Sequence, residues 1–346
     1  QFAGVVLWDE TTETGTFEFD ASFLKTRLDL SPLMMPLHEL ERGNMIWSFP
    51  GLPKQTYHGL PGLLADSLPD KFGNELIDAW LVRQGRTPES MNPVERLCYI
   101  GKRGMGALEY EPATQQTDNS STGLDIDELV TLAKEAMEVK RGLHINLNDK
   151  DGLLDIIKVG TSAGGARAKA VIAFNETTEE VRSGQTDVPD GFTHWLIKLD
   201  GVTNNELGDP KNYGRIEYAY YKMALACGID MAESKLMEKN GRAHFMTRRF
   251  DRPQGNEKLH MQTLCGLAHY DYNQPTTYSY EQAFQVMRNL MLEPADAEQL
   301  YRRMVFNVLA RNQDDHTKNI SFLMDKEGTW KLSPAYDVTY AYDPSN

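Results

Sequence analysis

The sequence predicts an α+β protein built in two lobes, and three observations support this prediction. Short runs that alternate apolar and polar residues, separated by Gly and Pro, indicate paired strands through much of residues 1–252. Apolar residues recur at helical spacing across residues 280–312. Residues 112–123 are polar with almost no aliphatic side chains, which predicts a linker or a long surface loop.

The first of three expected domains, residues 1–112, should be a compact α+β module. Phe17-Glu18-Phe19 alternates directly after Gly15, as a strand does, and repeated Pro and Gly residues then interrupt the chain as far as Pro53. The run from Leu60 to Asp70 leads into an amphipathic stretch that ends near Gly85. Strand and helix signals are therefore mixed within this domain.

The second expected domain, residues 124–252, should be rich in strands. Asp125 or Asp127 could cap a helix at its start. A second helix is expected over residues 212–227, where Gly228 ends the pattern. Strands are expected at residues 171–174 and 193–199 and on both sides of Asn240-Gly241, a pair that suits a two-residue type I′ turn.

The third expected domain, residues 253–346, should be mainly helical and return to strands at its end. The long helical pattern over residues 280–312 accounts for its helices. Strands are expected at residues 320–324 and 330–332, joined by a turn at Glu327-Gly328. Strand signals thus come first in the chain and the long helices after them.

Composition excludes several classes of function. Lys and Arg total 36 against 50 Asp and Glu, a formal net charge of −14, and so acidic a surface repels nucleic-acid backbones. Three widely spaced cysteines without a CxxC pair argue against a disulfide framework or a thiolate zinc site and suit a reducing cytosol. No apolar run approaches the roughly 20 residues of a membrane span. We therefore expect a cytoplasmic protein.

The most specific motif places Asp314 and Asn319 in a D-x-x-x-x-N spacing directly after a long helical pattern. Kinases use such a pair on one loop, the Asp to accept a proton from the attacking hydroxyl and the Asn to hold Mg²⁺. Asp337 follows the second strand of the next hairpin, where a kinase carries its other metal-binding carboxylate. The alternative is a polar turn followed by an ordinary strand end, but the three residues in this order favour phosphoryl transfer.

Lys198 lies late in an alternating strand, where a kinase lysine contacts nucleotide phosphates and pairs with a helix glutamate. Glu217, in the following helix, is the possible partner, and an exposed lysine on an edge strand is the alternative. Three arginines after the Asn-Gly hairpin, Arg248, Arg249 and Arg252, are more often part of a salt-bridged surface, and we do not assign them to phosphate.

A glycine-rich run at residues 160–169 contains Ser162, Gly164 and Gly165 and is small enough to bring backbone N–H groups close to a phosphate. It also matches G-x-S-x-G, the nucleophile elbow of α/β-hydrolases, but the elbow needs a helix after the serine and here a strand follows. A plain Gly-Gly turn in a hairpin remains an alternative. We expect a glycine-rich lid over nucleotide phosphates.

Five motifs in this order resemble the HipA family of toxin–antitoxin serine/threonine kinases, and the resemblance spans nearly the whole chain. The motifs are Ser162-Ala-Gly-Gly-Ala-Arg-Ala-Lys169, His194-Trp-Leu-Ile-Lys198, Arg249-Phe-Asp-Arg252, Asp314-Asp-His-Thr-Lys-Asn319 and Pro334-Ala-Tyr-Asp337. The N-terminal part, with Leu60-Pro-Gly62 and Asp66-Ser-Leu-Pro-Asp70, is similar to the N-terminal subdomain of that family. The resemblance implies a two-lobed, protein-kinase-like fold whose helical lobe has further helices.

The resemblance also implies a role for each site residue. Asp314 would be the catalytic base, and Asn319 and Asp337 would hold Mg²⁺. ATP would be bound by the loop residues Ser162, Gly164 and Gly165, by Lys198 and His316, and by the carbonyl of Arg248 and the amide of Phe250. Ser162 would also be the autophosphorylation site, where a phosphate repels the ligand that the loop serves.

The same resemblance implies a function and a set of partners. Toxins of this family phosphorylate a translation component such as an aminoacyl-tRNA synthetase, arrest growth, and are neutralised by a helix-turn-helix antitoxin of the HipB type that carries the DNA binding. Two other functions stay open: a small-molecule phosphotransferase with the same three site residues, and a non-catalytic kinase-fold module that binds a DNA-binding partner.

Overall fold

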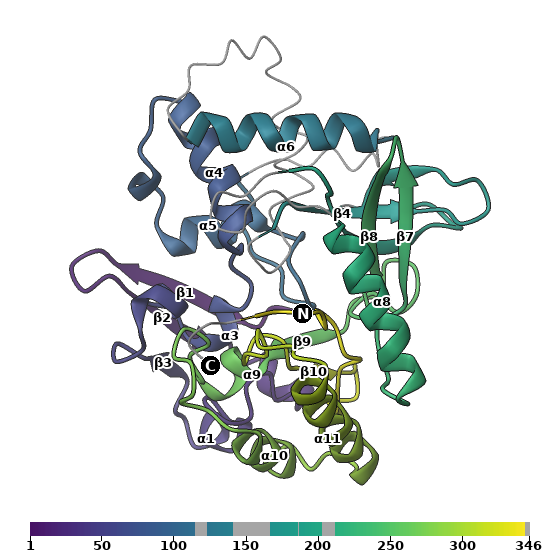
Figure 1. Ribbon diagram of the computed structural model, residues 1–346. Helices are drawn as coiled ribbons and strands as arrows, with labels where there is room; N and C mark the ends of the chain where they lie inside the picture. The colour runs from purple at the N-terminus through teal and green to yellow at the C-terminus, as the bar shows by residue number, and fades with distance from the viewer. Residues whose placement is uncertain (115–122, 141–166, 186, 203–211, 343–346) are drawn as a thin grey trace. The chain divides into compact units, whose positions relative to one another are not determined.

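The computed structural model describes residues 1–114, 123–140, 167–185, 187–202 and 212–342, and they form two compact units (Figure 1). Unit 1 consists of Gln1–Leu68, Ala224–Met231 and Leu259–Asn346. Unit 2 consists of Pro69–Met223 and Ala232–Lys258. Both units are assembled from separate stretches of chain. The sequence led us to expect consecutive domains at residues 1–112, 124–252 and 253–346, and these domain limits remain a prediction. Most of the expected linker, residues 115–122, lies outside the described residues.

A five-stranded antiparallel sheet organises unit 2, in the order β5-β4-β6-β8-β7. Its strands are β4 (Lys169–Phe174), β5 (Val181–Ser183), β6 (Thr193–Lys198), β7 (Ser234–Lys239) and β8 (Arg242–Arg248). β4, β6 and the β7–β8 pair confirm the expected strands. Asn240 and Gly241 join β7 to β8 with φ angles of 50° and 78°, the positive values that a type I′ turn requires.

One face of this sheet is covered by helices. These helices include α4 (Lys71–Arg83), α5 (Pro93–Ile100) and α6 (Ile126–Lys140). A further helix, α8 (Tyr213–Ala226), carries Glu217, whose partner Lys198 lies on the other face of the sheet, and its last residues belong to unit 1. Leu76 and Ile77 of α4 and Val130 of α6 share one buried cluster with Trp195 and Ile197 of β6. Because side chains alternate along a strand, His194 and Lys198 fall on the opposite face of β6.

The helix caps follow the sequence signals. Asp125 caps α6, since its Oδ1 accepts hydrogen bonds from the N–H groups of Asp127 at 2.8 Å and Glu128 at 3.2 Å. Asn92 and Glu95 form a reciprocal capping box at the start of α5. Of the two candidate caps before residue 129, the structure therefore selects Asp125.

Unit 1 contains two three-stranded antiparallel sheets, in the orders β1-β2-β3 and β11-β10-β9. The first has β1 (Gly4–Asp9), β2 (Thr14–Phe19) and β3 (Ile46–Ser48); the second has β9 (His260–Thr263), β10 (Ser321–Met324) and β11 (Trp330–Leu332). β10 and β11 confirm the hairpin expected after residue 319. β9 was not expected from the sequence, because it is short and pairs with a strand that lies far along the chain.

The longest helices of unit 1 lie in sequence between β9 and β10, two strands of the second sheet. They are α10 (Tyr280–Asn289) and α11 (Pro294–Leu309). The continuous helical pattern expected over residues 280–312 is thus interrupted, since Met291 adopts a positive φ of 55° and Pro294 opens α11. Short helices complete the unit: α1 (Leu37–Glu41), α2 (Lys54–Tyr57), α3 (Gly62–Ala65) and α9 (Leu264–Ala268).

Asp66 connects the first and last stretches of unit 1. Its carboxylate accepts hydrogen bonds from the backbone N–H of Thr263 at 2.7 Å and from the Thr263 hydroxyl at 2.8 Å. A Cβ added at Gly266 would lie 2.2 Å from this carboxylate, so the close approach requires glycine. Burial raises the pKa of Asp66 to about 6. Among the described segments, no helix has the length and apolar character needed to cross a membrane.

Candidate active site

Lys198 and Glu217 form an ion pair inside unit 2. Nζ of Lys198, the last residue of β6, lies 2.6 Å from Oε1 of Glu217 on α8, and the two side chains are 16% and 5% exposed. β6 is flanked by β4 and β8, so Lys198 is not on an edge strand. The structure therefore brings together the lysine and the helix glutamate that the sequence suggested as partners.

The loop after α11 is closed by its own hydrogen bonds. The amide Nδ2 of Asn319 donates to the backbone carbonyl of Asp314 at 2.7 Å, and the backbone N–H of Asn319 donates to the carbonyl of His316 at 2.8 Å. Because Nδ2 is the donor, Oδ1 of Asn319 is left as an acceptor. The five-residue spacing of the motif thus makes a compact turn that fixes the amide.

Two adjacent carboxylates in this loop have different environments. The Asp314 side chain is 67% exposed, and its Oδ1 lies 3.8 Å from Nε2 of His316. Asp315 is half-buried and accepts a hydrogen bond from the hydroxyl of Tyr280, and burial raises its pKa. The carboxylate of Asp314 is therefore accessible to solvent, whereas Asp315 holds the loop against α10.

Asp337 follows β11 in a left-handed backbone conformation, with φ of 54°. The residue before it, Tyr336, donates its hydroxyl to the carbonyl of Lys318 at 2.6 Å. Lys318 precedes Asn319, so the phenol of Tyr336 joins the Asp337 segment to the loop that contains Asn319. In the sequence, Tyr336 was notable only as the neighbour of Asp337. Its hydrogen bond to Lys318 depends on the fold and could not be predicted from the sequence.

The donor chemistry of Asn319 and Asp337 suits Mg²⁺. The two residues carry an amide oxygen and a carboxylate, and Mg²⁺ prefers such hard oxygen ligands. Within the described ranges, no group of three or more His, Cys, Asp or Glu side chains could hold a metal ion. Mg²⁺ in phosphotransferases commonly takes one or two protein carboxylates and adds substrate phosphates and waters, so two protein ligands fit this metal.

The other expected nucleotide residues are spread over both units. In unit 1, the ring of His316 lies 5.3 Å from that of Tyr272. In unit 2, Arg248 ends β8 and its side chain lies 3.3 Å from Glu233, while Phe250 is half-buried two residues later. Ser162, Gly164 and Gly165 lie outside the described residues.

Two of the three arginines after the hairpin correct the sequence interpretation. Arg249 and Arg252 were expected on a salt-bridged surface, but both are almost completely buried around Asp251. Another buried ion pair, Lys169–Asp70 at 2.9 Å, was also missed. Charged side chains are assigned to the surface by default, and no local pattern distinguishes those with a buried partner.

Family models identify the chain at both ends. The HipA N-terminal domain matches residues 1–111, and the HipA-like C-terminal domain matches residues 161–346. The chain belongs to the HipA family. Its α+β, kinase-like fold is that of a solved structure from Shewanella oneidensis MR-1, described as the toxin–antitoxin system HipA, HipB and its operator DNA complex. That match has a TM-score of 0.64 at 17% identity and covers 98% of this chain and 74% of the other.

Curated relatives of this HipA-family chain carry kinase names. "Putative kinase Y4mE" of Sinorhizobium fredii is 29% identical over 158 residues, which is 42% of this chain and 35% of the relative. A "Putative kinase" of Haemophilus influenzae is 26% identical over 135 residues, covering 35% of this chain and 39% of the relative. The chain thus spans about two fifths of the length of the curated relatives it matches.

Proposed function

We propose that this chain carries the nucleotide site of an ATP- and Mg²⁺-dependent serine/threonine protein kinase. The observation that supports the proposal most directly is the Lys198–Glu217 ion pair, since kinases use a strand lysine held by a helix glutamate to contact ATP phosphates. The closed loop from Asp314 to Asn319 also supports the proposal, because it would be the second part of the kinase arrangement. We retain the three sequence-derived domains, 1–112, 124–252 and 253–346, as part of this proposal.

The proposed chemistry assigns Asp314 as the base. Its exposed carboxylate would accept the proton of a serine or threonine hydroxyl as that oxygen attacks the γ-phosphorus of ATP and the bond to ADP breaks. His316, beside Asp314, would lie next to the nucleotide. Lys198 would contact the phosphates, while the carbonyl of Arg248 and the amide of Phe250 would bind adenine.

Asn319 and Asp337 would hold Mg²⁺, which, when bound, neutralises phosphate charge. The chain itself would keep these two residues in place through the Asn319–Asp314 and Tyr336–Lys318 hydrogen bonds. Ser162, with Gly164 and Gly165, would cover the phosphates and serve as the autophosphorylation site. A phosphate there would repel ATP.

The biological role that we propose is that of the toxin in a toxin–antitoxin pair. The similar Shewanella structure is described as a complex with HipB and operator DNA, which supports a helix-turn-helix partner of the HipB type for this chain. DNA would then be reached through that partner, in keeping with the net charge of −14. The proposed acceptor is a translation component such as an aminoacyl-tRNA synthetase.

The test is incubation with γ-labelled ATP and Mg²⁺, followed by intact-mass and peptide mass spectrometry of wild type and Asp314→Ala. We expect phosphate on Ser162 in wild type alone. Nucleotide binding without label in the presence of candidate acceptor proteins would contradict the protein-kinase proposal, and transfer to a metabolite hydroxyl would identify a small-molecule phosphotransferase. Absence of both label and nucleotide binding would favour the non-catalytic module.

A further inference from the structure

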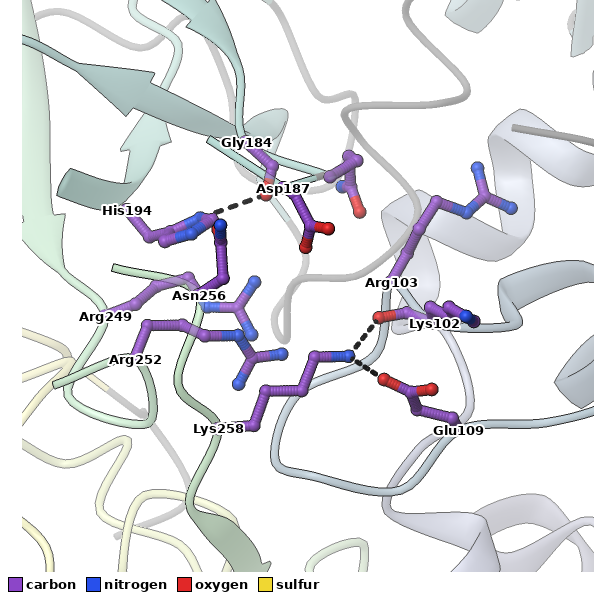
Figure 2. Close-up of a pocket in the computed structure, with 11 residues that line it drawn as sticks. Lys102, Arg103, Glu109, Gly184, Asp187, His194, Arg249, Arg252, Asn256 and Lys258 are labelled. Atoms are coloured by element: carbon purple, nitrogen blue, oxygen red, sulfur yellow. Dashed lines mark hydrogen bonds and ion pairs between the residues drawn. The ribbon is translucent and has the colours of Figure 1, made fainter. Parts of the chain in front are cut away.

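Unit 2 contains a pocket of about 300 Å³ that is lined by an excess of cationic side chains (Figure 2). Its lining residues come from three segments of this unit: Lys102, Arg103, Glu109, Gly184, Gln185, Asp187, His194, Arg249, Arg252, Asn256 and Lys258. Lys198, Arg248 and Phe250 are not among them, so this pocket is lined by other residues than those proposed for ATP. Its volume is at the lower end of the range for small-molecule sites.

A buried triad of charges forms one wall of the pocket. Arg249 donates to the Asp251 carboxylate through Nε at 3.0 Å and Nη2 at 2.7 Å, and Arg252 donates to it through Nη1 at 2.8 Å. All three side chains are almost completely buried. Two guanidinium groups share one carboxylate, so the triad carries one positive charge that the carboxylate does not neutralise.

This charge persists at neutral pH. Burial lowers the pKa of Arg252 to about 10, which still leaves it protonated. Burial alone would raise the pKa of Asp251, but the charges of Arg249 and Arg252 hold it far below its ordinary value. Since an uncompensated charge away from water is costly, the triad favours an anion in the adjoining pocket.

The arginines keep donors for such an anion. The hydrogen bonds of Arg249 use Nε and Nη2, and its Nη1 has no partner among the described residues. In Figure 2, Arg249, Arg252 and Lys258 extend toward the middle of the pocket, whereas Arg103 is directed away from it. Arg103 instead donates to the carbonyl groups of Ile100 and Tyr99.

His194 adds a requirement of a different kind. Its Nδ1 lies 3.1 Å from the carbonyl of Gly184, which can only accept, so Nδ1 carries the proton and Nε2 is an acceptor. Nε2 is buried and has no partner within the described part of the chain. Burial, together with the charges of Arg249 and Arg252, lowers the pKa of His194 to about 4, so the ring is neutral near pH 7. A ligand that satisfies this pocket therefore needs a negative charge and a hydroxyl donor.

The walls that hold these groups are supported by specific contacts. Asn256 accepts a hydrogen bond from the backbone N–H of Val188 at 2.8 Å, which holds the segment after Gly184. A Cβ added at Gly184 would lie 2.5 Å from the backbone of Ile172, so this close approach requires glycine. Lys258 lies 2.6 Å from Glu109, and Lys102 is an exposed cation at the rim.

We propose that this pocket binds a phosphate-type oxyanion that carries a hydroxyl, with hydrogenphosphate as the simplest example. Its negative oxygens would meet Arg249 and Arg252, and its hydroxyl would donate to Nε2 of His194. Sulfate has similar size and charge but no proton at neutral pH, so it leaves the histidine acceptor unsatisfied. A site built around a hydroxyl discriminates against an analogue that lacks one.

The test is calorimetric titration of the nucleotide-free chain at pH 7.5 and constant ionic strength, with phosphate, sulfate and glycerol 3-phosphate in parallel. We expect one saturable phosphate site, with sulfate about tenfold weaker. Tighter binding of glycerol 3-phosphate would identify a small phosphorylated metabolite as the source of the group, and weaker binding would identify free phosphate. No saturable binding below about 10 mM would overturn the proposal.

Four variants separate this pocket from other phosphate sites. Lys102→Glu should weaken phosphate about five- to tenfold, whereas Lys25→Glu, a charge reversal at another exposed lysine, should have no effect. Lys198→Gln should also have no effect; loss of binding in this variant alone would assign the phosphate to the proposed nucleotide site and overturn the inference.

His194→Asn keeps a donor near Gly184 but removes the Nε2 acceptor, so the preference for phosphate over sulfate should disappear. If His194→Asn does not fold, the Lys102→Glu variant and the comparison of phosphate with sulfate still test whether phosphate binds in this pocket. These experiments measure phosphate binding and not turnover, so their outcome does not depend on whether the chain is a kinase.

Discussion

At the scale of single residues, the neighbours Asp314 and Asp315 show how environment divides the roles of identical side chains. Asp314 is exposed and lies near His316, whereas Asp315 is half-buried against Tyr280. Exposure suits a group that must reach a substrate hydroxyl. A carboxylate held by a partly buried phenol suits the maintenance of loop structure.

Alanine substitution should separate these roles. Asp315→Ala leaves the hydroxyl of Tyr280 without this partner and should lower the free energy of unfolding by about 1–3 kcal/mol. Asp314→Ala should change it by less than about 0.5 kcal/mol but abolish phosphoryl transfer. Urea unfolding and a γ-labelled ATP assay measure the two effects. Full turnover in Asp314→Ala would remove this residue from the mechanism.

The Lys198–Glu217 pair leads to a second prediction at this scale. Lys198→Met removes the cation expected to contact nucleotide phosphates and should weaken ATP binding about tenfold or more, as expected for hydrogen bonds to charged groups. Lys222→Met, at an exposed position on α8, is the matched control and should leave the affinity unchanged. Fluorescence titration with an ATP analogue gives both values. Equal affinities would contradict the phosphate role of Lys198.

At the scale of elements, the β7–β8 hairpin shows how far local turn chemistry decides structure. Asn240-Gly241 makes the two-residue turn that the sequence predicted, and both residues have positive φ. The helical pattern before residue 312 was less informative, because it did not distinguish one helix from α10 and α11. The break between α10 and α11 depends on the positive φ of Met291. The sequence gives no sign of such a conformation at a residue other than glycine.

Two glycines in unit 2 allow a controlled test of the turn. No atom lies within 4 Å of a Cβ added at Gly241 or at Gly123, but only Gly241 has a positive φ, of 78°. Gly241→Ala should therefore lower the free energy of unfolding by about 1–2 kcal/mol, whereas Gly123→Ala should be neutral or slightly stabilising. Thermal unfolding of both variants tests this difference. Equal effects would show that backbone strain in the turn does not limit stability.

At the scale of the whole molecule, buried titratable groups in each unit couple stability to pH. Burial lowers the pKa of His260 and His269 in unit 1 and of His194 in unit 2 to about 4. Unfolding lets each ring bind a proton near its ordinary pKa, about 6.5, so stability falls as pH drops from about 6.5 to 4. Asp66 acts in the opposite sense, since its raised pKa favours the folded state at the lower end of this range.

Asp315, whose pKa burial also raises, acts in the same sense as Asp66. We expect the three histidines, each with a pKa lowered to about 4, to outweigh these two carboxyl groups, so the urea midpoint should rise between pH 4.5 and pH 7. His260→Gln should flatten this dependence by an amount of order 1–3 kcal/mol, whereas His38→Gln, at an exposed position, should preserve it. The measurement is urea unfolding at several pH values, fitted to two transitions if the two units unfold separately. A midpoint that falls with rising pH would show that the buried carboxyl groups outweigh the histidines.

Local patterns in the sequence were enough to predict the α+β class, the longer helices, most of the described strands, and the family. These depend on periodicity, turn residues and ordered motifs, which are properties of neighbouring positions. The partnership of Lys198 with Glu217 was suggested by such a pattern, and the fold brought the two side chains into contact.

Three properties became visible in the folded chain alone: which charged residues are buried, which of two carboxylates is accessible, and how distant segments combine. Arg249 and Arg252 were expected at the surface, but they surround Asp251 beside a pocket that is also lined by residues 102–109 and 184–194, which lie far away in sequence. β9 exists because β10, about 60 residues later, pairs with it. Burial and long-range pairing depend on contacts between remote parts of the chain, so no local pattern contains them.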